Sequence, residues 1–152
     1  GYHTGSVWPH DSAIAAAGLK RYGYHEEATT LAWAVLDAAR RSPGFRLPEL
    51  FCGFERDALG VPVVHPVSCA PQAWSAAAAL RLVTTMLGLV PHAPAGELEI
   101  ERPVLPAGLG RVLVRDLPVG AARVDLLFHR WRGTTSAEVL RRSGDVRVTV
   151  RL

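Results

Sequence analysis

The sequence lacks the features of several large protein classes. It contains only two cysteines in 152 residues, Cys52 and Cys69, so a disulfide framework is excluded and free thiols in a reducing cytoplasm are the simplest interpretation. It has no CxxC motif and no histidine-rich cluster, and we therefore expect neither a metal nor a cofactor. No uninterrupted apolar run reaches the roughly 18 residues of a membrane span, which argues against a membrane partner.

The N-terminus and the charge distribution exclude further classes. Residues 1–5 have no initiator methionine and do not resemble a signal peptide, so we expect the chain to be part of a longer protein. The net charge of +3 arises in residues 97–152, with ten basic and seven acidic residues, because residues 1–96 carry seven of each. These arginines are spread along strand-like segments, and we expect no nucleic-acid partner.

Three helices are expected in the first part of the chain. Pro9–Tyr22 begins with a proline and ends before a glycine, and His25–Arg41 has one apolar stripe with acidic residues at its start and basic residues at its end. The third helix, Pro71–Leu89, is apolar almost all round, a composition typical of burial on every side. Because three helices cannot bury one another in this way, we expect an incomplete helical domain.

The apolar period changes from 3.6 to 2 beyond Gly96, which predicts strands. We expect an α+β protein in two parts, residues 1–92 with helices and residues 93–152 with a small antiparallel β region that is polar on one face. The alternating segments are Glu97–Glu101, Arg111–Arg115, Arg123–Phe128 and Val146–Arg151, with Ser136–Leu140 as a further candidate.

Glu49 lies in a loop of about 26 residues between the second and third helices, and loops of that length in compact domains are usually functional or disordered. The rigid Pro48 precedes Glu49, and Leu47, Leu50 and Phe51 flank it. We expect these apolar neighbours to raise the pKa of the carboxyl group, which suits acid–base chemistry near neutral pH. A solvent-exposed glutamate at a loop bend is the alternative.

Aromatic and polar residues gather where loops enter helices, and such residues suit a sugar site. Aromatic rings stack on the apolar faces of a pyranose, while carboxylate, imidazole and amide groups bind its hydroxyl groups. Simpler roles stay open, because Asp11 can cap a helix, His10 can be structural and Trp74 can belong to the core. The candidate residues are Trp8, His10, Asp11, Glu49, Phe51, Gln72 and Trp74.

Three motifs together resemble a known family. Tyr2–Asp11 (YHTGSVWPHD), Leu47–Phe54 (LPELFCGF) and Pro66–Trp74 (PVSCAPQAW) are similar in order and spacing to the last part of bacterial amylo-alpha-1,6-glucosidase (glycogen debranching enzyme) type proteins. The resemblance covers residues 2 to about 90. It implies a glucoamylase-like (α/α)6 barrel, of which this chain would supply the C-terminal helices, and glycoside hydrolysis with inversion at the anomeric carbon.

The resemblance also implies residue roles. Glu49 matches the segment that holds the general base, Trp8 would form a wall of the glucose subsite, and His10 and Asp11 would bind hydroxyl groups. Gln72 and Trp74 would be further wall residues, and Phe51 adds an aromatic ring near Glu49. The general acid of such enzymes lies upstream of the matched segment.

The expected function is therefore that of a cytoplasmic inverting α-glycosidase of carbohydrate metabolism, with an α-glucoside or oligosaccharide as substrate. The parent protein is expected to be a glycoside hydrolase, whereas the isolated chain, which lacks the general acid, is expected to be inactive. The alternative is an inactive carbohydrate-binding module, or a structural module that completes a barrel. A missing upstream segment or self-association would then provide the neighbours of the third helix.

Overall fold

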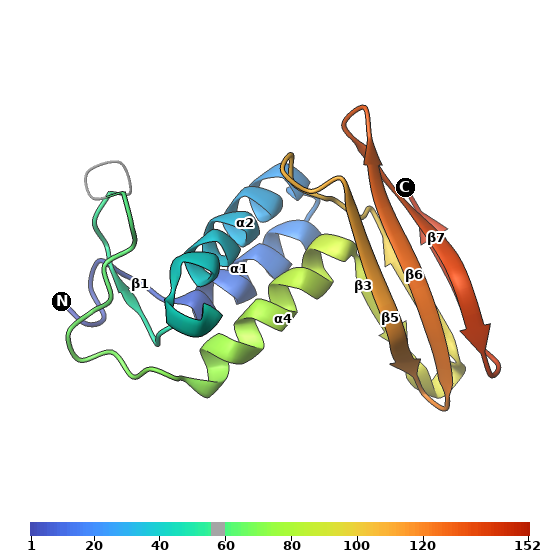
Figure 1. Ribbon diagram of the computed structural model, residues 1–152, viewed down its shortest axis with the longest axis horizontal. Helices are drawn as coiled ribbons and strands as arrows, with labels where there is room; N and C mark the ends of the chain where they lie inside the picture. The colour runs from blue at the N-terminus through green and yellow to red at the C-terminus, as the bar shows by residue number, and fades with distance from the viewer. Residues whose placement is uncertain (56–59) are drawn as a thin grey trace. The chain divides into compact units, whose positions relative to one another are not determined.

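The computed structural model describes residues 1–55 and 60–152 (Figure 1), which divide into two compact units, residues 1–83 and 84–152. The first unit contains a short strand pair and the helices, and α4 continues into the second unit. Its elements in chain order are β1 (Ser6–Val7), α1 (Pro9–Arg21), α2 (His25–Arg41), the 3-10 turn η1 (Pro43–Phe45), β2 (Phe51–Cys52) and α4 (Ala73–Leu87).

The α1–α2 hairpin follows directly from local sequence signals. Pro9 occupies the first turn of α1, where its missing N–H removes no helical hydrogen bond. Gly23 lies in the short connection to α2 with a φ of 91°, a conformation that glycine adopts without steric cost. The buried face of α2 contains Ala28, Ala32 and Ala38, and such small side chains allow close approach to α1, which contacts α2.

The third helix, α4, is apolar almost all round, but the described residues do not bury it on all sides. Ser75, Ala78 and Leu82 are buried, but Leu80 is 72% exposed and Val83 is also exposed. The apolar composition of α4 shows that burying the helix would be favourable. It does not show which segment would cover the helix. The helix also ends two residues earlier than predicted, because Gly88 adopts a φ of 69° beside the backbone of Glu101.

The second unit consists of two three-stranded sheets. One sheet has the order β3-β4-β8 and the other has the order β5-β6-β7. The pairing of β4 with β8 is parallel, so the expectation of a purely antiparallel region is wrong for this pair. The strands are β3 (Leu89–His92), β4 (Glu97–Glu101), β5 (Arg111–Val119), β6 (Ala122–Trp131), β7 (Thr134–Ser143) and β8 (Arg147–Arg151), and the 3-10 turn η2 (Ala93–Ala95) follows β3.

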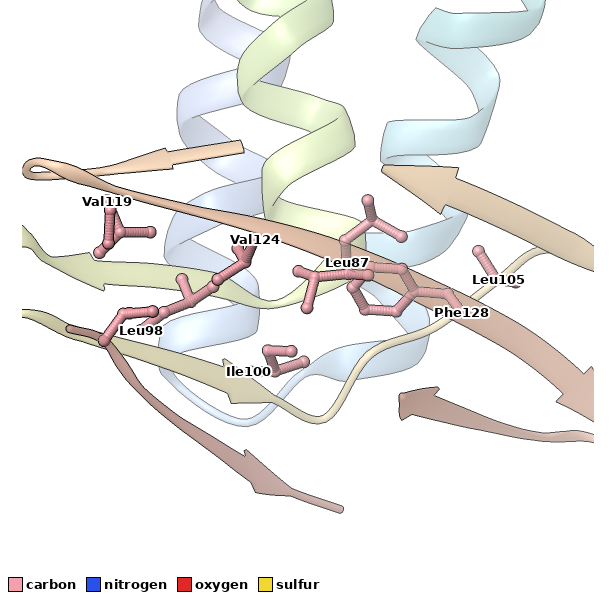
Figure 2. Packing of buried hydrophobic residues seen from close by; sticks show 10 residues of the cluster. Leu87, Leu98, Ile100, Leu105, Val119, Val124 and Phe128 are labelled. Carbon is pink, nitrogen blue, oxygen red and sulfur yellow. The ribbon is translucent and has the colours of Figure 1, made fainter. Parts of the chain in front are cut away.

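Alternation along the strands places one apolar core in the second unit. Leu98 and Ile100 from β4 join Val124 and Phe128 from β6 in this core, and Leu87 at the end of α4 also belongs to it (Figure 2). In β6 the buried positions alternate with more exposed ones, as expected for a sheet with one buried face. The core therefore stabilises the second unit through residues from both of its sheets.

The chain is mixed α+β, and the expected (α/α)6 barrel is wrong. The described residues form three α-helices and eight strands in three small sheets, rather than rings of paired helices. The barrel was inferred from the resemblance, and the apolar composition of α4 indicated only that the helix has too few neighbours in this chain. Among the described residues, no helix combines the length and hydropathy that crossing a membrane requires.

Candidate functional site

Glu49 lies immediately before β2, between two other segments of the first unit. Strand β2 pairs antiparallel with β1, so Phe51 lies opposite Val7 and Cys52 opposite Ser6. On the other side, the Glu49 N–H donates to the Cys69 carbonyl oxygen at 2.9 Å, and the Leu50 N–H donates to the Ser68 hydroxyl oxygen at 3.1 Å. The loop around Glu49 is therefore held by segments before α1 and before α4.

A close backbone contact fixes the same region. A Cβ atom at Gly53 would overlap the carbonyl oxygen of Gly5, so only glycine permits this approach of the two chains. The contact lies directly after β2 and directly before β1. It therefore explains why a glycine follows β2.

Glu49 is a buried residue, 7% exposed, and its carboxylate has several hydrogen-bond donors. The Tyr2 hydroxyl donates to it, as do the Gln72 side chain and the Cys69 thiol. The Cys69 N–H also donates to Oε2 of Glu49 at 3.3 Å. These donors, with Tyr2 first, hold the pKa of Glu49 below its ordinary value, because their stabilisation of the charged form outweighs its desolvation.

The expectation that apolar neighbours raise the pKa of Glu49 is therefore wrong. Leu47 and Leu50 are buried beside Glu49, and burial does act in the expected direction. The sequence did not reveal the donors, since Tyr2 and Cys69 come from distant segments. In return, the Glu49 carboxylate raises the pKa of Tyr2 to about 12, mainly through their hydrogen bond.

Six rings form what we call the aromatic cluster, which Tyr2 links to this carboxylate. Tyr2 contacts Trp8 edge-on with ring centroids 5.1 Å apart, and it contacts His65 in the same way at 5.6 Å. Two imidazoles stack on indoles, one pair at 5.6 Å and the other at 5.4 Å. The members of the aromatic cluster are Tyr2, His3, Trp8, His10, His65 and Trp74.

The structure brings most of the predicted site residues together. Trp8 and Trp74 have their ring centroids 6.3 Å apart, and His10 from α1 stacks on Trp74 at an interplanar angle of 16°. Gln72 precedes α4 and directs its Oε1 to the N–H of Ala73 at 2.9 Å. Its NH₂ group is therefore the part that donates to Glu49.

Two predicted site residues lie apart from this arrangement. Phe51 is buried in the β1–β2 pair opposite Val7, so its ring packs in the interior. Asp11 is exposed in the first turn of α1, where a carboxylate is favoured by the helix dipole. Trp74, in contrast, is 42% exposed, so its role as a fully buried core residue is excluded.

Sequence reasoning missed four residues that contact Glu49 or the rings, namely Tyr2, His3, His65 and Cys69. All four lie in or next to the motifs at residues 2–11 and 66–74, which is the signal that could have identified them. Their meeting depends on the pairing of β1 with β2, two strands of two residues each, and such short strands leave no alternation to recognise.

The arrangement suits binding of a neutral polyol more than metal chemistry. In the part of the chain that the structure describes, no group of three or more His, Cys, Asp or Glu side chains could hold a metal ion. Two of the histidines instead stack on indole rings. A fixed carboxylate beside partly exposed aromatic rings is the combination that binds sugar hydroxyl groups and sugar faces together.

Comparison with known proteins assigns no family to this arrangement. No protein-family model and no curated protein matches the chain.

Proposed function

We propose that the Glu49 site binds an α-glucoside and that Glu49 acts as the general base of an inverting glycoside hydrolase. The observation that carries the proposal is the position of a fixed carboxylate next to the aromatic cluster. The resemblance of the three motifs to amylo-alpha-1,6-glucosidase type proteins supports the same chemistry. The proposal does not depend on a helical barrel.

Each residue has a distinct part in this proposal. The low pKa of Glu49 keeps its carboxylate ionised at neutral pH, so it can accept a proton from the water that attacks the anomeric carbon. Trp74 offers an exposed indole to the apolar face of the sugar, with His10 stacked on it. Gln72 and His10 are the hydroxyl partners. Inversion also requires a general acid roughly 6.5–9.5 Å from the base, and the resemblance places that acid upstream.

The test compares Glu49→Gln with Glu55→Gln in the parent protein, which also carries the general acid. Glu55 is an exposed glutamate six positions later in the same loop. Binding of maltose, isomaltose and 1-deoxynojirimycin is measured by calorimetry, and the anomer first released from the disaccharides is read by NMR. We expect β-glucose as the first product. Glu49→Gln should lower kcat by about 10²–10⁴-fold, the usual contribution of general base catalysis, and should leave binding within a few-fold.

Two results would overturn this assignment. Release of α-glucose first would exclude inversion, since an inverting enzyme converts an α-glucoside into the β-anomer. Unchanged turnover in Glu49→Gln would exclude the role of Glu49 as base. Glu55→Gln should behave like the unmodified protein in every measurement.

A sugar-binding module without catalysis is the second candidate function. It is favoured by the number of donors on Glu49, since a carboxylate that already accepts hydrogen bonds from Tyr2, Cys69 and Gln72 is a weak base. In that case maltose or 1-deoxynojirimycin would bind, no glucose would be released, and Glu49→Gln would weaken binding.

We also propose a cytoplasmic location for this activity. The support is that Cys52 and Cys69 are both free thiols, and free thiols persist in the reducing cytoplasm. Fractionation of cells that produce the protein, with immunodetection in each fraction, should place it with cytoplasmic markers. Recovery outside the cytoplasm would contradict this location.

A further inference from the structure

Tyr2 lies where the three segments of the site meet. Its hydroxyl donates to the Glu49 carboxylate, while its ring contacts Trp8 just before α1 and His65 in the loop before α4. Tyr2 is only partly exposed. It therefore joins the carboxylate to both neighbouring segments through one rigid side chain.

We propose that Tyr2 is a positioning residue that holds the Glu49 carboxylate in place, a role in catalysis that rests on the proposed function of Glu49 as general base. Tyr2 is not assigned to touch the sugar or the reacting water. It acts through Glu49, and its effect is on the orientation and the charge of that carboxylate.

The surroundings of Tyr2 keep its ring in place. Edge-on contacts at 5.1 Å to Trp8 and 5.6 Å to His65 lie in the range favoured for aromatic pairs. Trp8 is itself stacked on His3, with an interplanar angle of 9°. Because the ring is held by neighbours from two segments, the position of its hydroxyl oxygen is restricted as well.

The other donors to Glu49 contribute less to its low pKa than Tyr2 does. The Cys69 N–H reaches one oxygen, Oε2, at 3.3 Å, a long hydrogen bond. Gln72 and the Cys69 thiol also donate, and a thiol is a weak donor. Of the causes that lower the pKa of Glu49, the hydrogen bond from Tyr2 is the largest.

Tyr2 and Glu49 each shift the pKa of the other. The neutral phenol stabilises the ionised carboxylate and so lowers the pKa of Glu49, and the carboxylate raises the pKa of Tyr2 to about 12. Removing the hydroxyl group alone should therefore raise the pKa of Glu49. Removing the carboxylate charge should lower the pKa of Tyr2.

The experiment uses Tyr2→Phe, which keeps the ring and removes the hydroxyl, with Tyr22→Phe as the control at a tyrosine that is 82% exposed. Carbon-13 NMR follows the Glu49 carboxyl titration, assigned by its loss in Glu49→Gln. We expect Tyr2→Phe to move that titration, and the acidic limb of the kcat/KM profile, to higher pH. The kcat/KM profile is measured in the parent protein, which carries the general acid, and there we also expect kcat to fall about 10-fold while KM stays within about 2-fold.

A reciprocal measurement keeps the test valid if Tyr2→Phe unfolds. Ultraviolet titration of tyrosinate should show a transition near pH 12 that is absent in Tyr2→Phe, and in Glu49→Gln this transition should move to lower pH. An unchanged Glu49 titration in Tyr2→Phe, or an unchanged phenol transition in Glu49→Gln, would overturn the positioning role.

The outcomes separate this inference from the proposed function. If both titrations move as expected but no α-glucoside binds or is hydrolysed, Tyr2 does hold Glu49 in place. The proposed function then fails, and the Tyr2–Glu49 pair has no role in catalysis. If glucosides are hydrolysed through Glu49 and neither titration moves, the proposed function stands and the role of Tyr2 is overturned.

Discussion

Glu49 and Cys69 are joined by two hydrogen bonds, and the backbone N–H of each residue donates to the other residue. The Glu49 N–H donates to the Cys69 carbonyl oxygen at 2.9 Å, and the Cys69 N–H donates to Oε2 of Glu49 at 3.3 Å. The Cys69 side chain is exposed, although its backbone belongs to the site. A reagent in solvent can therefore reach a residue that is in direct contact with the proposed base.

Alkylation of Cys69 should weaken sugar binding. Carboxamidomethylation by iodoacetamide removes the thiol hydrogen that is donated to Glu49 and adds bulk beside the carboxylate. We expect treated protein to lose most of its binding of 1-deoxynojirimycin in calorimetry. Cys69→Ser should bind normally and resist the reagent, whereas Cys52→Ser should stay sensitive. Equal binding before and after complete alkylation would show that Cys69 lies away from the sugar.

Trp74 provides the second prediction. It is partly exposed and carries His10 on one side, so Trp74→Ala should remove the stacking surface proposed for the sugar. Loss of an aromatic contact worth about 1.4 kcal/mol corresponds to about 10-fold weaker binding. The matched control is Trp131→Ala, an exposed tryptophan at the end of β6. Equal effects of the two substitutions on Kd would contradict the proposed platform.

The helices and many strands of this fold follow from local physical signals. Helix α2 has the predicted bounds, His25–Arg41, because its apolar stripe and the charges at its ends all favour the same segment. In the β region, the prediction for Glu97–Glu101 is confirmed by β4. Strand β7 extends well beyond the predicted Ser136–Leu140, because antiparallel pairing with β6 continues past the residues that alternate clearly.

Local sequence signals also predicted some of the candidate site residues, but not their contacts. Residues inside a motif, such as Trp8 and Gln72, were named as candidates because their types suit sugar binding. Tyr2 was not assigned, since its contact with Glu49 depends on which loop lies beside β1. The parallel pairing of β4 with β8 and the exposed face of α4 likewise depend on distant parts of the chain, and no local period encodes them.

The third prediction concerns pH and Asp125 in the second unit. Arg141 donates two hydrogen bonds to this carboxylate, at 2.8 and 3.1 Å, and the Asp116 N–H donates a third at 2.8 Å. These contacts, with Arg141 first, lower the pKa of Asp125 to about 2. Because the folded state favours the ionised form, the stabilisation is complete above the ordinary pKa of about 3.9 and is lost as pH falls through about 2.

Asp125→Asn should therefore lower Tm at pH 7, and its difference from the unmodified protein should shrink steadily between pH 4 and pH 2. The control is Asp145→Asn, at an exposed bend between β7 and β8. Thermal unfolding followed by circular dichroism at several pH values measures both variants. A difference in Tm for Asp125→Asn that stays constant down to pH 2 would show that the charge of this carboxylate does not stabilise the fold.

The last prediction tests whether the β1–β2 pairing is what assembles the site. A Cβ atom at Gly53 would overlap the Gly5 carbonyl oxygen, so Gly53→Ala must displace the segment that carries Tyr2 from the loop that carries Glu49. We expect a loss of about 1–3 kcal/mol in the free energy of unfolding, as for other overpacked positions. We also expect the Tyr2 titration near pH 12 to move to lower pH, because the hydrogen bond to Glu49 lengthens.

Gly18→Ala is the matched control, since nothing lies within 4 Å of a Cβ at this helical position, and alanine there should stabilise α1 by about 0.5–1 kcal/mol. If Gly53→Ala kept the stability and the tyrosine titration of the unmodified protein, the site would be held by the Cys69 segment alone.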